Sequence, residues 1–322
     1  MNVLITGGCG FIGAWILKRL IADGDAVTVL DAQPTTARWE MLLDREQIAR
    51  VRVVQARIDD QAAVATLVRE VGPQAIIHLA GLQVPTCKAD PIAGAMVNVV
   101  GSLAVFEAAK ACSTRPRIVY ASSAAVFGSD GDYAGTVDDL AKERPGTHYG
   151  AFKLCIEHCA RAYWETHQLV SVGLRPLTVY GPGRDTGLTS FPTRAIAAVM
   201  LGQRFDIPFS GPTAYIHARE VAEMFIACAR GTVAEAAVYT VGGDVVDTPG
   251  FIRALATVVP AAAQLVTCSG GDLPIASRLD DAALRRDYPG LPRIPLRQGI
   301  EETVAVFAGL QRQGLLVGAT TA

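Results

Sequence analysis

A tyrosine and a lysine stand four residues apart in the segment YGAFK, at Tyr149 and Lys153. On a helix this spacing places both side chains on one face, about one turn apart. A tyrosine acts as a general acid/base near neutral pH if its pKa falls by about three units, which corresponds to about 4 kcal/mol. A lysine ammonium about 4 Å away supplies about that much at an effective dielectric near 20. The pair therefore predicts proton transfer at a hydroxyl or carbonyl group.

A YxxxK pair alone is more often a solvated helix face than a catalytic site. Here the pair follows Arg117–Ala121, a predicted strand that leads into Ser122 and Ser123. Small hydroxyl residues at the carboxyl end of a strand lie where open α/β sheets bind their ligands. The two segments together favour the catalytic interpretation.

A glycine-rich loop follows the first predicted strand, with glycines at Gly7, Gly8, Gly10 and Gly13. Residues without Cβ allow a sharp turn, close approach of a pyrophosphate, and tight packing of helix on strand. Asp31 ends the second predicted strand, where an acidic side chain accepts hydrogen bonds from ribose hydroxyls and repels a 2′-phosphate. The pattern predicts NAD. NADP stays an alternative cofactor, because two arginines, Arg38 and Arg57, are nearby in the sequence. The alternative without any cofactor is a glycine-rich turn followed by an aspartate that caps a strand.

Apolar runs of strand length alternate with runs of helical periodicity through the first half of the chain. Strands that lack polar alternation must be covered on both faces, and alternation with helices favours a parallel sheet with right-handed crossovers. We therefore predict a doubly wound α/β domain of Rossmann type. The predicted buried strands are 2–6, 26–30, 51–55, 75–78, 117–121 and 170–174, and the predicted helices are 11–22, 61–71, 91–111 and 149–167.

The pattern loosens after Tyr180 into a polar loop and shorter elements. We predict a dinucleotide-binding domain over residues 1–177, and over residues 178–322 mainly a smaller substrate-binding cap interleaved with returning segments of the sheet. Further elements are expected as helices near 194–201, 219–230, 249–259 and 297–310, and as strands near 205–208 and 237–241.

Composition narrows the classes of partner. Lys and Arg number 29 against 31 Asp and Glu, for a net charge of -2 and no basic run, so we expect no nucleic-acid partner. Apolar stretches look too short for a membrane span, and we expect a cytoplasmic protein. The seven cysteines and five histidines show no metal-ligand spacing, so we expect reduced cysteines and no metal. His217 is expected to be structural.

The motifs taken together resemble the extended short-chain dehydrogenase/reductase family, which includes NAD-dependent nucleotide-sugar epimerases and dehydratases. The resemblance covers nearly the whole chain and rests on TGGCGFIG at Thr6–Gly13, HLAG at His78–Gly81, Asn98 before Gly101, SSAAVFG at Ser122–Gly128, YGAFK, and LRPLTVYGPG at Leu174–Gly183. It implies that Ser123 binds the reacting oxygen, that Tyr149 is the acid/base, and that Lys153 lowers the tyrosine pKa and binds ribose. It also implies cofactor contacts along the chain: Gly7, Gly10, Phe11, Ile12, Gly13, Asp31, Ile58, Ala80, Gly81, Gln83, Asn98, Tyr149, Lys153 and Pro176.

This chain departs from the family pattern where the substrate binds. Relatives that use nucleotide sugars commonly carry Asn at the place of Thr178, and an Arg within the stretch that matches residues 211–214, to hold the diphosphate. A nucleotide sugar is accordingly less favoured. Loops on a rigid scaffold tend to carry specificity, and the residues expected to contact substrate are Ala125, Thr178, Arg184, Thr189 and Ser190.

The resulting prediction is an NAD-dependent oxidoreductase that transfers hydride at a secondary alcohol or ketone of a sugar or sugar-derived substrate. The same residues serve a nucleotide-sugar epimerase or dehydratase with tightly bound NAD, which stays the alternative. A dinucleotide-sensing module without catalysis is a third interpretation, against which the intact Ser123, Tyr149 and Lys153 argue. The resemblance also implies a homodimer through two helices, at 98–111 and 149–167, although their periodicity alone suits the core of a monomer equally well.

Overall fold

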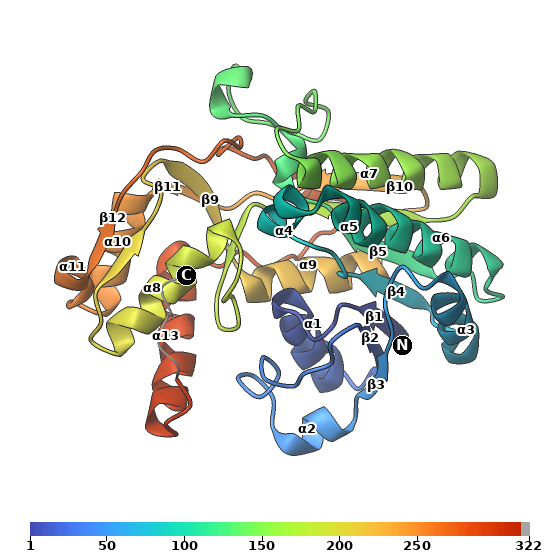
Figure 1. Cartoon of the computed structure of the whole chain (residues 1–322), viewed down its shortest axis with the longest axis horizontal. Helices are drawn as coiled ribbons and strands as arrows, with labels where there is room; N and C mark the ends of the chain where they lie inside the picture. Colours follow the sequence, from blue (N-terminus) through green and yellow to red (C-terminus); the bar gives the residue numbers. More distant parts are fainter. Residues whose placement is uncertain (317–322) are drawn as a thin grey trace.

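A computed structural model describes residues 1–316 of the chain. Its centre is a seven-stranded sheet, parallel throughout, in the order β3-β2-β1-β4-β5-β6-β10 (Figure 1). The strand order reverses between β1 and β4, where open α/β sheets bind ligands. The strands are β1 (Asn2–Thr6), β2 (Ala26–Asp31), β3 (Arg52–Gln55), β4 (Ala75–His78), β5 (Arg117–Ala121), β6 (Ser171–Arg175) and β10 (Ala236–Thr240).

Helices cover both faces of this sheet, as strands with apolar side chains on both faces require. On β1, Val3 and Ile5 belong to the core under α1 (Phe11–Ala22) and α9 (Ala218–Arg230), whereas Leu4 belongs to the opposite core. That opposite core is closed by α3 (Gln61–Val71), α6 (Gly101–Ala111) and α7 (His148–His167). The predicted doubly wound α/β fold is thereby confirmed.

Most elements of the first half lie within one residue of their predicted bounds, but one prediction is wrong. The third strand is an edge strand, with Val53 39% exposed, because only β2 pairs with it. The long helix predicted over 91–111 is present as one helical run, Pro91–Ala111, which consists of α5 (Pro91–Ala95), a π-helical segment (Met96–Val100) and α6. Short helices α2 (Arg45–Ala49) and α4 (Val84–Ala89) lie in connections.

A smaller unit with its own core is built from the second half of the chain. Its strands β7 (Thr178–Tyr180), β9 (Pro212–His217) and β11 (Asp244–Asp247) form one sheet, and β8 (Phe205–Ile207) pairs with β12 (Val266–Cys268). Around them lie α8 (Phe191–Met200), α10 (Thr248–Val258), α11 (Ala262–Leu265) and α13 (Leu296–Arg312). In contrast α9, β10 and α12 (Ala282–Asp287) pack with the large sheet.

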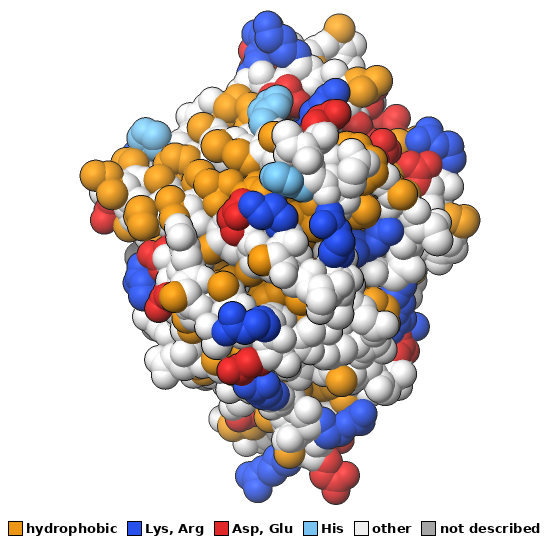
Figure 2. All heavy atoms as spheres, turned by 90° about the vertical axis from the view of Figure 1, so that its right-hand side faces the viewer, with side chains coloured by type: hydrophobic (Ala, Val, Ile, Leu, Met, Phe, Trp, Pro, Cys, Tyr) orange, Lys and Arg blue, Asp and Glu red, His pale blue; other side chains and the backbone are white. Residues whose placement is uncertain are grey.

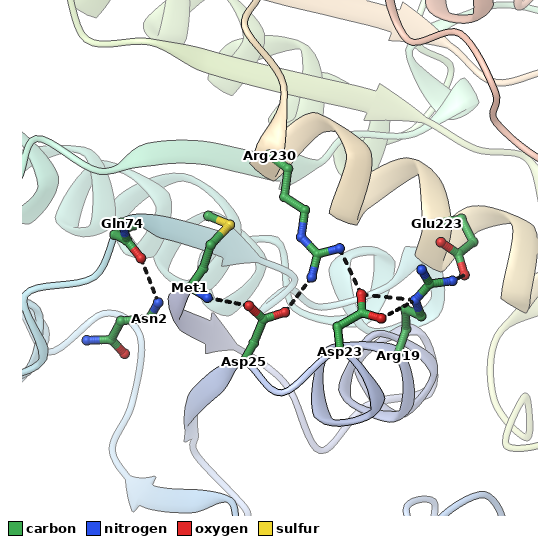
Figure 3. Close-up of polar contacts among 8 residues, drawn as sticks. All are labelled: Met1, Asn2, Arg19, Asp23, Asp25, Gln74, Glu223 and Arg230. Atoms are coloured by element: carbon green, nitrogen blue, oxygen red, sulfur yellow. Dashed lines mark hydrogen bonds and ion pairs between the residues drawn. The ribbon is translucent and has the colours of Figure 1, made fainter.

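Ion pairs connect α9 to α1 and to the turn between α1 and β2 (Figure 3). Arg230, the last residue of α9, donates to Asp23 at 2.8 Å and also pairs with Asp25, both in the turn between α1 and β2. Arg19 of α1 reaches back to Glu223 of α9 at 2.7 Å. Segments about 200 residues apart in sequence therefore hold α1 in place against the sheet.

One helical run, Pro91–Ala111, has the length and apolar composition that a membrane crossing requires, and half of it is buried inside the protein. The expectation that no apolar stretch reaches that length is therefore wrong. The run also contains the polar residues Asn98, Glu107 and Lys110. A helix in the core of a large soluble domain can have the same length and apolar composition. Its buried half packs in the core shared with α3 and α7.

Candidate active site

The glycine loop between β1 and α1 adopts a conformation that only glycine fits. Gly7 has a φ of +69°, and a Cβ on it would lie 2.7 Å from the backbone nitrogen of Ala80. A Cβ on Gly13 would lie 2.5 Å from the carbonyl oxygen of Gly8. Gly10 is the N-cap of α1 and supplies no side-chain acceptor, so the first backbone N–H groups of the helix face the loop's cavity side. This arrangement suits a pyrophosphate.

Asp31 lies at the end of β2, next to this loop. Its carboxylate accepts from the backbone nitrogens of Cys9 at 3.1 Å and Gln33 at 3.0 Å, which fixes its orientation. The two arginines that kept NADP open already have partners: Arg38 pairs with Asp185 at 2.8 Å, and Arg57 pairs with Asp59 at 2.6 Å.

A cavity of about 590 Å³ runs from Asp31 across the glycine loop to the end of β5, a size that accommodates a dinucleotide in part or whole. A Cβ on Gly81 would lie 2.7 Å from the side-chain oxygen of Asn98, so this edge of the cavity also depends on a residue without a side chain. Of the predicted cofactor contacts, those that line this cavity are Gly7, Gly10, Phe11, Ile12, Gly13, Asp31, Ile58, Ala80, Gly81 and Gln83. The residues present fit the predicted cofactor.

The predicted catalytic side chains converge from β5 and α7. Ser123 follows β5 and its hydroxyl accepts from the backbone nitrogen of Ala125 at 3.1 Å, which caps a short 3₁₀ turn. Thr147 caps α7, so that Tyr149 lies in the first turn and Lys153 one turn later. The Lys153 ammonium donates to the carbonyl of Ala121 at 2.7 Å and lies 5.6 Å from the centroid of the Tyr149 ring.

The pKa of Tyr149 is raised, not lowered, because burial outweighs every other effect. The groups that oppose the rise are the hydrogen-bonding hydroxyl of Ser123 and the positive charge of Arg184. Burial also lowers the pKa of Lys153 to about 8. The pKa of Tyr149 is therefore not lowered as expected from Lys153, because desolvation disfavours the charged form of both side chains.

A second cavity of about 200 Å³ adjoins the first and shares Ile12, Gly81 and Arg184 with it. Ser123, Tyr149 and Lys153 lie in its wall. The other predicted residues in this wall are Gln83, Ala125, Pro176, Arg184 and Thr189. The catalytic candidates thus lie where the space for a dinucleotide meets a smaller space.

Three predicted site residues line neither cavity. Thr178 is fully buried and its hydroxyl shares a hydrogen bond of 2.7 Å with Thr213, so the prediction that it contacts substrate is not supported. Ser190 is fully buried as well, at the N-terminus of α8. Asn98 is buried and donates to the carbonyls of Leu82 and Gly94 at 3.1 Å. It therefore supports Leu82, a residue of the cavity wall, and does not line the cavity itself.

A chain of hydrogen bonds passes through His78, at the end of β4, and connects it to Thr6 and Ser102. Ser102 donates to the carbonyl of Asn98 at 2.6 Å, so it accepts from Nε2–H of His78 at 2.9 Å. The other ring nitrogen, Nδ1, then accepts from the Thr6 hydroxyl at 2.6 Å. Burial lowers the pKa of His78 to about 3, in keeping with a neutral ring that ties β1, β4 and the π-helical segment together.

Sequence reasoning missed a buried ion pair beneath the site. Glu157 lies one turn after Lys153 on the same face of α7 and pairs with Arg175 of β6 at 2.6 and 2.8 Å. It also accepts from the hydroxyl of Ser122, the neighbour of Ser123. The spacing of Tyr149, Lys153 and Glu157, four and four, was a signal that could have revealed it.

Replacing Lys153 by Met is expected to stabilise the cofactor-free protein at neutral pH. The folded pKa of about 8 lies below the unfolded value of about 10.4, so the buried ammonium destabilises the fold by about 3 kcal/mol below pH 8, and this penalty disappears as pH rises through 8 to 10. Loss of the bond to Ala121 offsets about 1 kcal/mol of the gain.

Urea unfolding at pH 7 and pH 9.5 tests this expectation, with the exposed Lys142→Met as the control. The Lys153→Met variant should be the more stable protein at pH 7 and lose its advantage at pH 9.5. An advantage of equal size at both pH values would show that the ammonium is not the cause.

Comparisons with known proteins agree with this site. A model of the NAD dependent epimerase/dehydratase family matches residues 3–242. The chain belongs to this family. Family membership makes it an enzyme with NAD as its cofactor, as the glycine loop and Asp31 predict. Across residues 1–316, no group of three or more His, Cys, Asp or Glu side chains is placed to hold a metal ion.

Relatives with different activities resemble the chain. It is 31% identical to a UDP-glucose 4-epimerase of Mycolicibacterium smegmatis over 95% of this chain and 98% of that protein. It is 34% identical to a D-erythronate dehydrogenase of Cupriavidus necator over 66% of each chain. Among solved structures, a UDP-glucose 4-epimerase of Thermus thermophilus in complex with NAD matches with a TM-score of 0.81 and 28% identity, covering 96% of this chain and 99% of that one.

Proposed function

We propose that the chain is an NAD-dependent oxidoreductase that transfers hydride at a secondary alcohol or ketone of a sugar-derived substrate. The observation that carries the proposal is that Ser123, Tyr149 and Lys153 lie together in the wall of the small cavity that adjoins the dinucleotide cavity. Bound NAD supplies or accepts the hydride. Residues after position 177, where β7 begins the smaller unit, would help to hold the substrate, among them Arg184 and Thr189.

Each catalytic side chain has one role in this proposal. Tyr149 exchanges the proton of the reacting oxygen. Ser123 orients that oxygen by a hydrogen bond, and the fixed contact between its hydroxyl and Ala125 holds the serine in place. Lys153 binds the ribose of the cofactor.

The raised pKa of Tyr149 favours one direction near neutral pH. A phenol that stays protonated donates its proton to a ketone oxygen as the ketone is reduced, whereas alcohol oxidation requires the phenolate. Oxidation is therefore expected to speed up as pH rises.

A nucleotide-sugar epimerase is the second candidate, favoured by the similarity to a UDP-glucose 4-epimerase over 95% of this chain. The two are separated by two incubations of the purified protein. In the first, NAD is added with a panel of aldoses, sugar acids and polyols, and NADH is followed by its absorbance. In the second, UDP-galactose is added without NAD. NADH formation supports the oxidoreductase, and UDP-glucose formation without NADH overturns it.

We also propose that the protein forms a homodimer through the outer faces of α5, α6 and α7. Apolar side chains recur there at helical spacing, with Ile92 78% exposed and Met96 40% exposed, followed by the half-buried Val99 and Leu103. Figure 2 shows apolar side chains gathered beside histidines in the upper left of the face onto which α6 and α7 extend. An apolar stripe of this kind supports a contact between two copies.

Replacing Ile92 by Glu is expected to convert the dimer to a monomer, because a charge would be buried in the contact. Light scattering coupled to size-exclusion chromatography measures the mass. The matched control is Leu140→Glu, which changes an apolar side chain that is 93% exposed in a loop. A dimer that persists in the Ile92 variant would exclude this interface.

A cytoplasmic location belongs to the same proposal. All seven cysteines are free, two of them, Cys155 and Cys159, one turn apart on α7. Free thiols in this number suit a reducing compartment.

A further inference from the structure

The charged groups of the smaller cavity are all positive. Among the described residues, its wall contains two cationic side chains, Lys153 and Arg184, and no aspartate or glutamate. The Lys153 ammonium has the carbonyl of Ala121 as its acceptor. The remaining wall is largely apolar, with leucine, isoleucine, valine and proline side chains from both halves of the chain. A ligand complementary to this space carries negative charge near Arg184.

Arg184 has donors without acceptors. Its Nε is buried and has no hydrogen-bond partner, and one terminal nitrogen donates to the hydroxyl of Thr189 at 2.9 Å. The adjacent carboxylate of Asp185 is occupied by Arg38, which contacts both of its oxygens at 2.8 and 2.9 Å. Within residues 1–316 Arg184 has no ion pair, and a buried unpaired donor on a charged group is costly unless a ligand supplies the acceptor.

The guanidinium lies beside the reacting position. It is close enough to Tyr149 for its charge to oppose the rise of the tyrosine pKa caused by burial, and its Cζ lies 5.6 Å from the ring centroid of Phe11 at the start of α1. The contact with Thr189 holds the side chain over the small cavity. A substrate whose hydroxyl reaches Tyr149 therefore places its next groups within reach of Arg184.

The space beside the catalytic residues suits a small ligand. The cavity of about 200 Å³ is below the range of about 300–1,000 Å³ in which drug-sized ligands bind. A nucleoside diphosphate sugar is larger and needs several donors for its two phosphates. The hydroxyl of Thr178 is instead hydrogen-bonded to Thr213, and among the described residues Arg184 is the cation of the wall with a buried donor, Nε, that lacks an acceptor.

We propose that the substrate is a small hydroxy acid, a polyol that carries a carboxylate, and that Arg184 binds this carboxylate while Tyr149 faces a secondary hydroxyl. The inference rests on the proposed function, because it takes Tyr149 as the group that meets the reacting oxygen. A planar guanidinium suits a carboxylate through paired hydrogen bonds. Arg184 is thus the residue that selects acids over neutral polyols.

Binding is measured without turnover in the Tyr149→Phe protein loaded with NAD. Calorimetry compares gluconate, ribonate and erythronate with the neutral alditols glucitol, ribitol and erythritol. At least one acid is expected to bind about 100-fold more tightly than its alditol. Adding Arg184→Met should remove that preference and leave alditol affinity within about threefold. Arg253→Met, at a side chain that is 73% exposed in α10, is the matched control and should change neither affinity.

Two results would overturn the inference. One is that no acid binds more tightly than its alditol. The other is that Arg184→Met weakens NADH binding tenfold without changing acid preference, which would assign Arg184 to the cofactor's phosphates.

Failure of the proposed function would look different. If the wild-type protein binds acids through Arg184 but interconverts UDP-sugars and forms no NADH with any acid, the oxidoreductase proposal fails and the carboxylate site stands.

Discussion

Replacing Tyr149 by Phe is expected to lower kcat by about 10²–10⁴-fold, the usual contribution of a positioned acid/base. The substitution removes only the hydroxyl, which lies in the wall of the small cavity and interacts with Ser123. The affinity for NADH should stay within a few-fold, because the ring remains in place against Lys153. Steady-state rates and a fluorescence titration with NADH measure the two quantities.

A matched control lies on the same helix. The hydroxyl of Tyr163 donates to Glu107 at 2.6 Å, and Tyr163 lines neither cavity. Tyr163→Phe should therefore keep wild-type turnover. Equal turnover in both variants would remove Tyr149 from the reaction. A pH profile adds a second check, since the raised tyrosine pKa predicts that wild-type alcohol oxidation increases from pH 7 to 9.

Replacing Glu157 by Gln is expected to destabilise the protein by about 3–5 kcal/mol. Both members of the pair are buried, with exposed side-chain fractions of 4% for Glu157 and 3% for Arg175, so the change leaves a buried guanidinium with Glu143 as its remaining partner. The bond from Ser122 weakens as well. Urea unfolding at pH 7 measures the loss.

Two further variants separate the buried pair from a general helix effect. Glu165→Gln removes a carboxylate of α7 that is 62% exposed and 3.9 Å from Arg161, and should cost less than about 1 kcal/mol. A double replacement of Glu157 and Arg175 by Met should recover much of the stability, since the carboxylate that then loses its partner is Glu143, whose side chain is 29% exposed to water. A loss in Glu165→Gln as large as that in Glu157→Gln would contradict this account.

The sheet and its helices could be predicted because strands that are buried on both faces appear in the sequence as short apolar runs without polar alternation. Each of β1, β4 and β5 contains an uninterrupted run of at least three apolar residues, and between β1 and α1 lie glycines at positions where a Cβ would clash with the backbone. In the smaller unit the strand predicted near 205–208 is present as β8, whereas β7 escaped prediction because it is three residues long and pairs with β9, where Thr178 is matched with Tyr215, 37 residues later.

The site was predictable in position and less so in energetics. Tyr149, Ser123 and Lys153 could be brought together because strand ends and helix starts meet at one edge of a parallel sheet. Thr178 was wrongly expected to contact substrate, because only the folded structure shows that its hydroxyl is hydrogen-bonded to Thr213. The lowered tyrosine pKa was argued from one pairwise attraction, whereas desolvation determines the shift in the folded protein.

A crystal structure of the wild-type protein with NADH tests the central claim most directly. The account predicts the adenosine ribose against Asp31, the pyrophosphate at the start of α1, and the nicotinamide ring where the two cavities meet, with Tyr149 and Ser123 both facing one point beside the ring. A nicotinamide ring bound away from that junction, or a Tyr149 hydroxyl directed away from the ring, would contradict it.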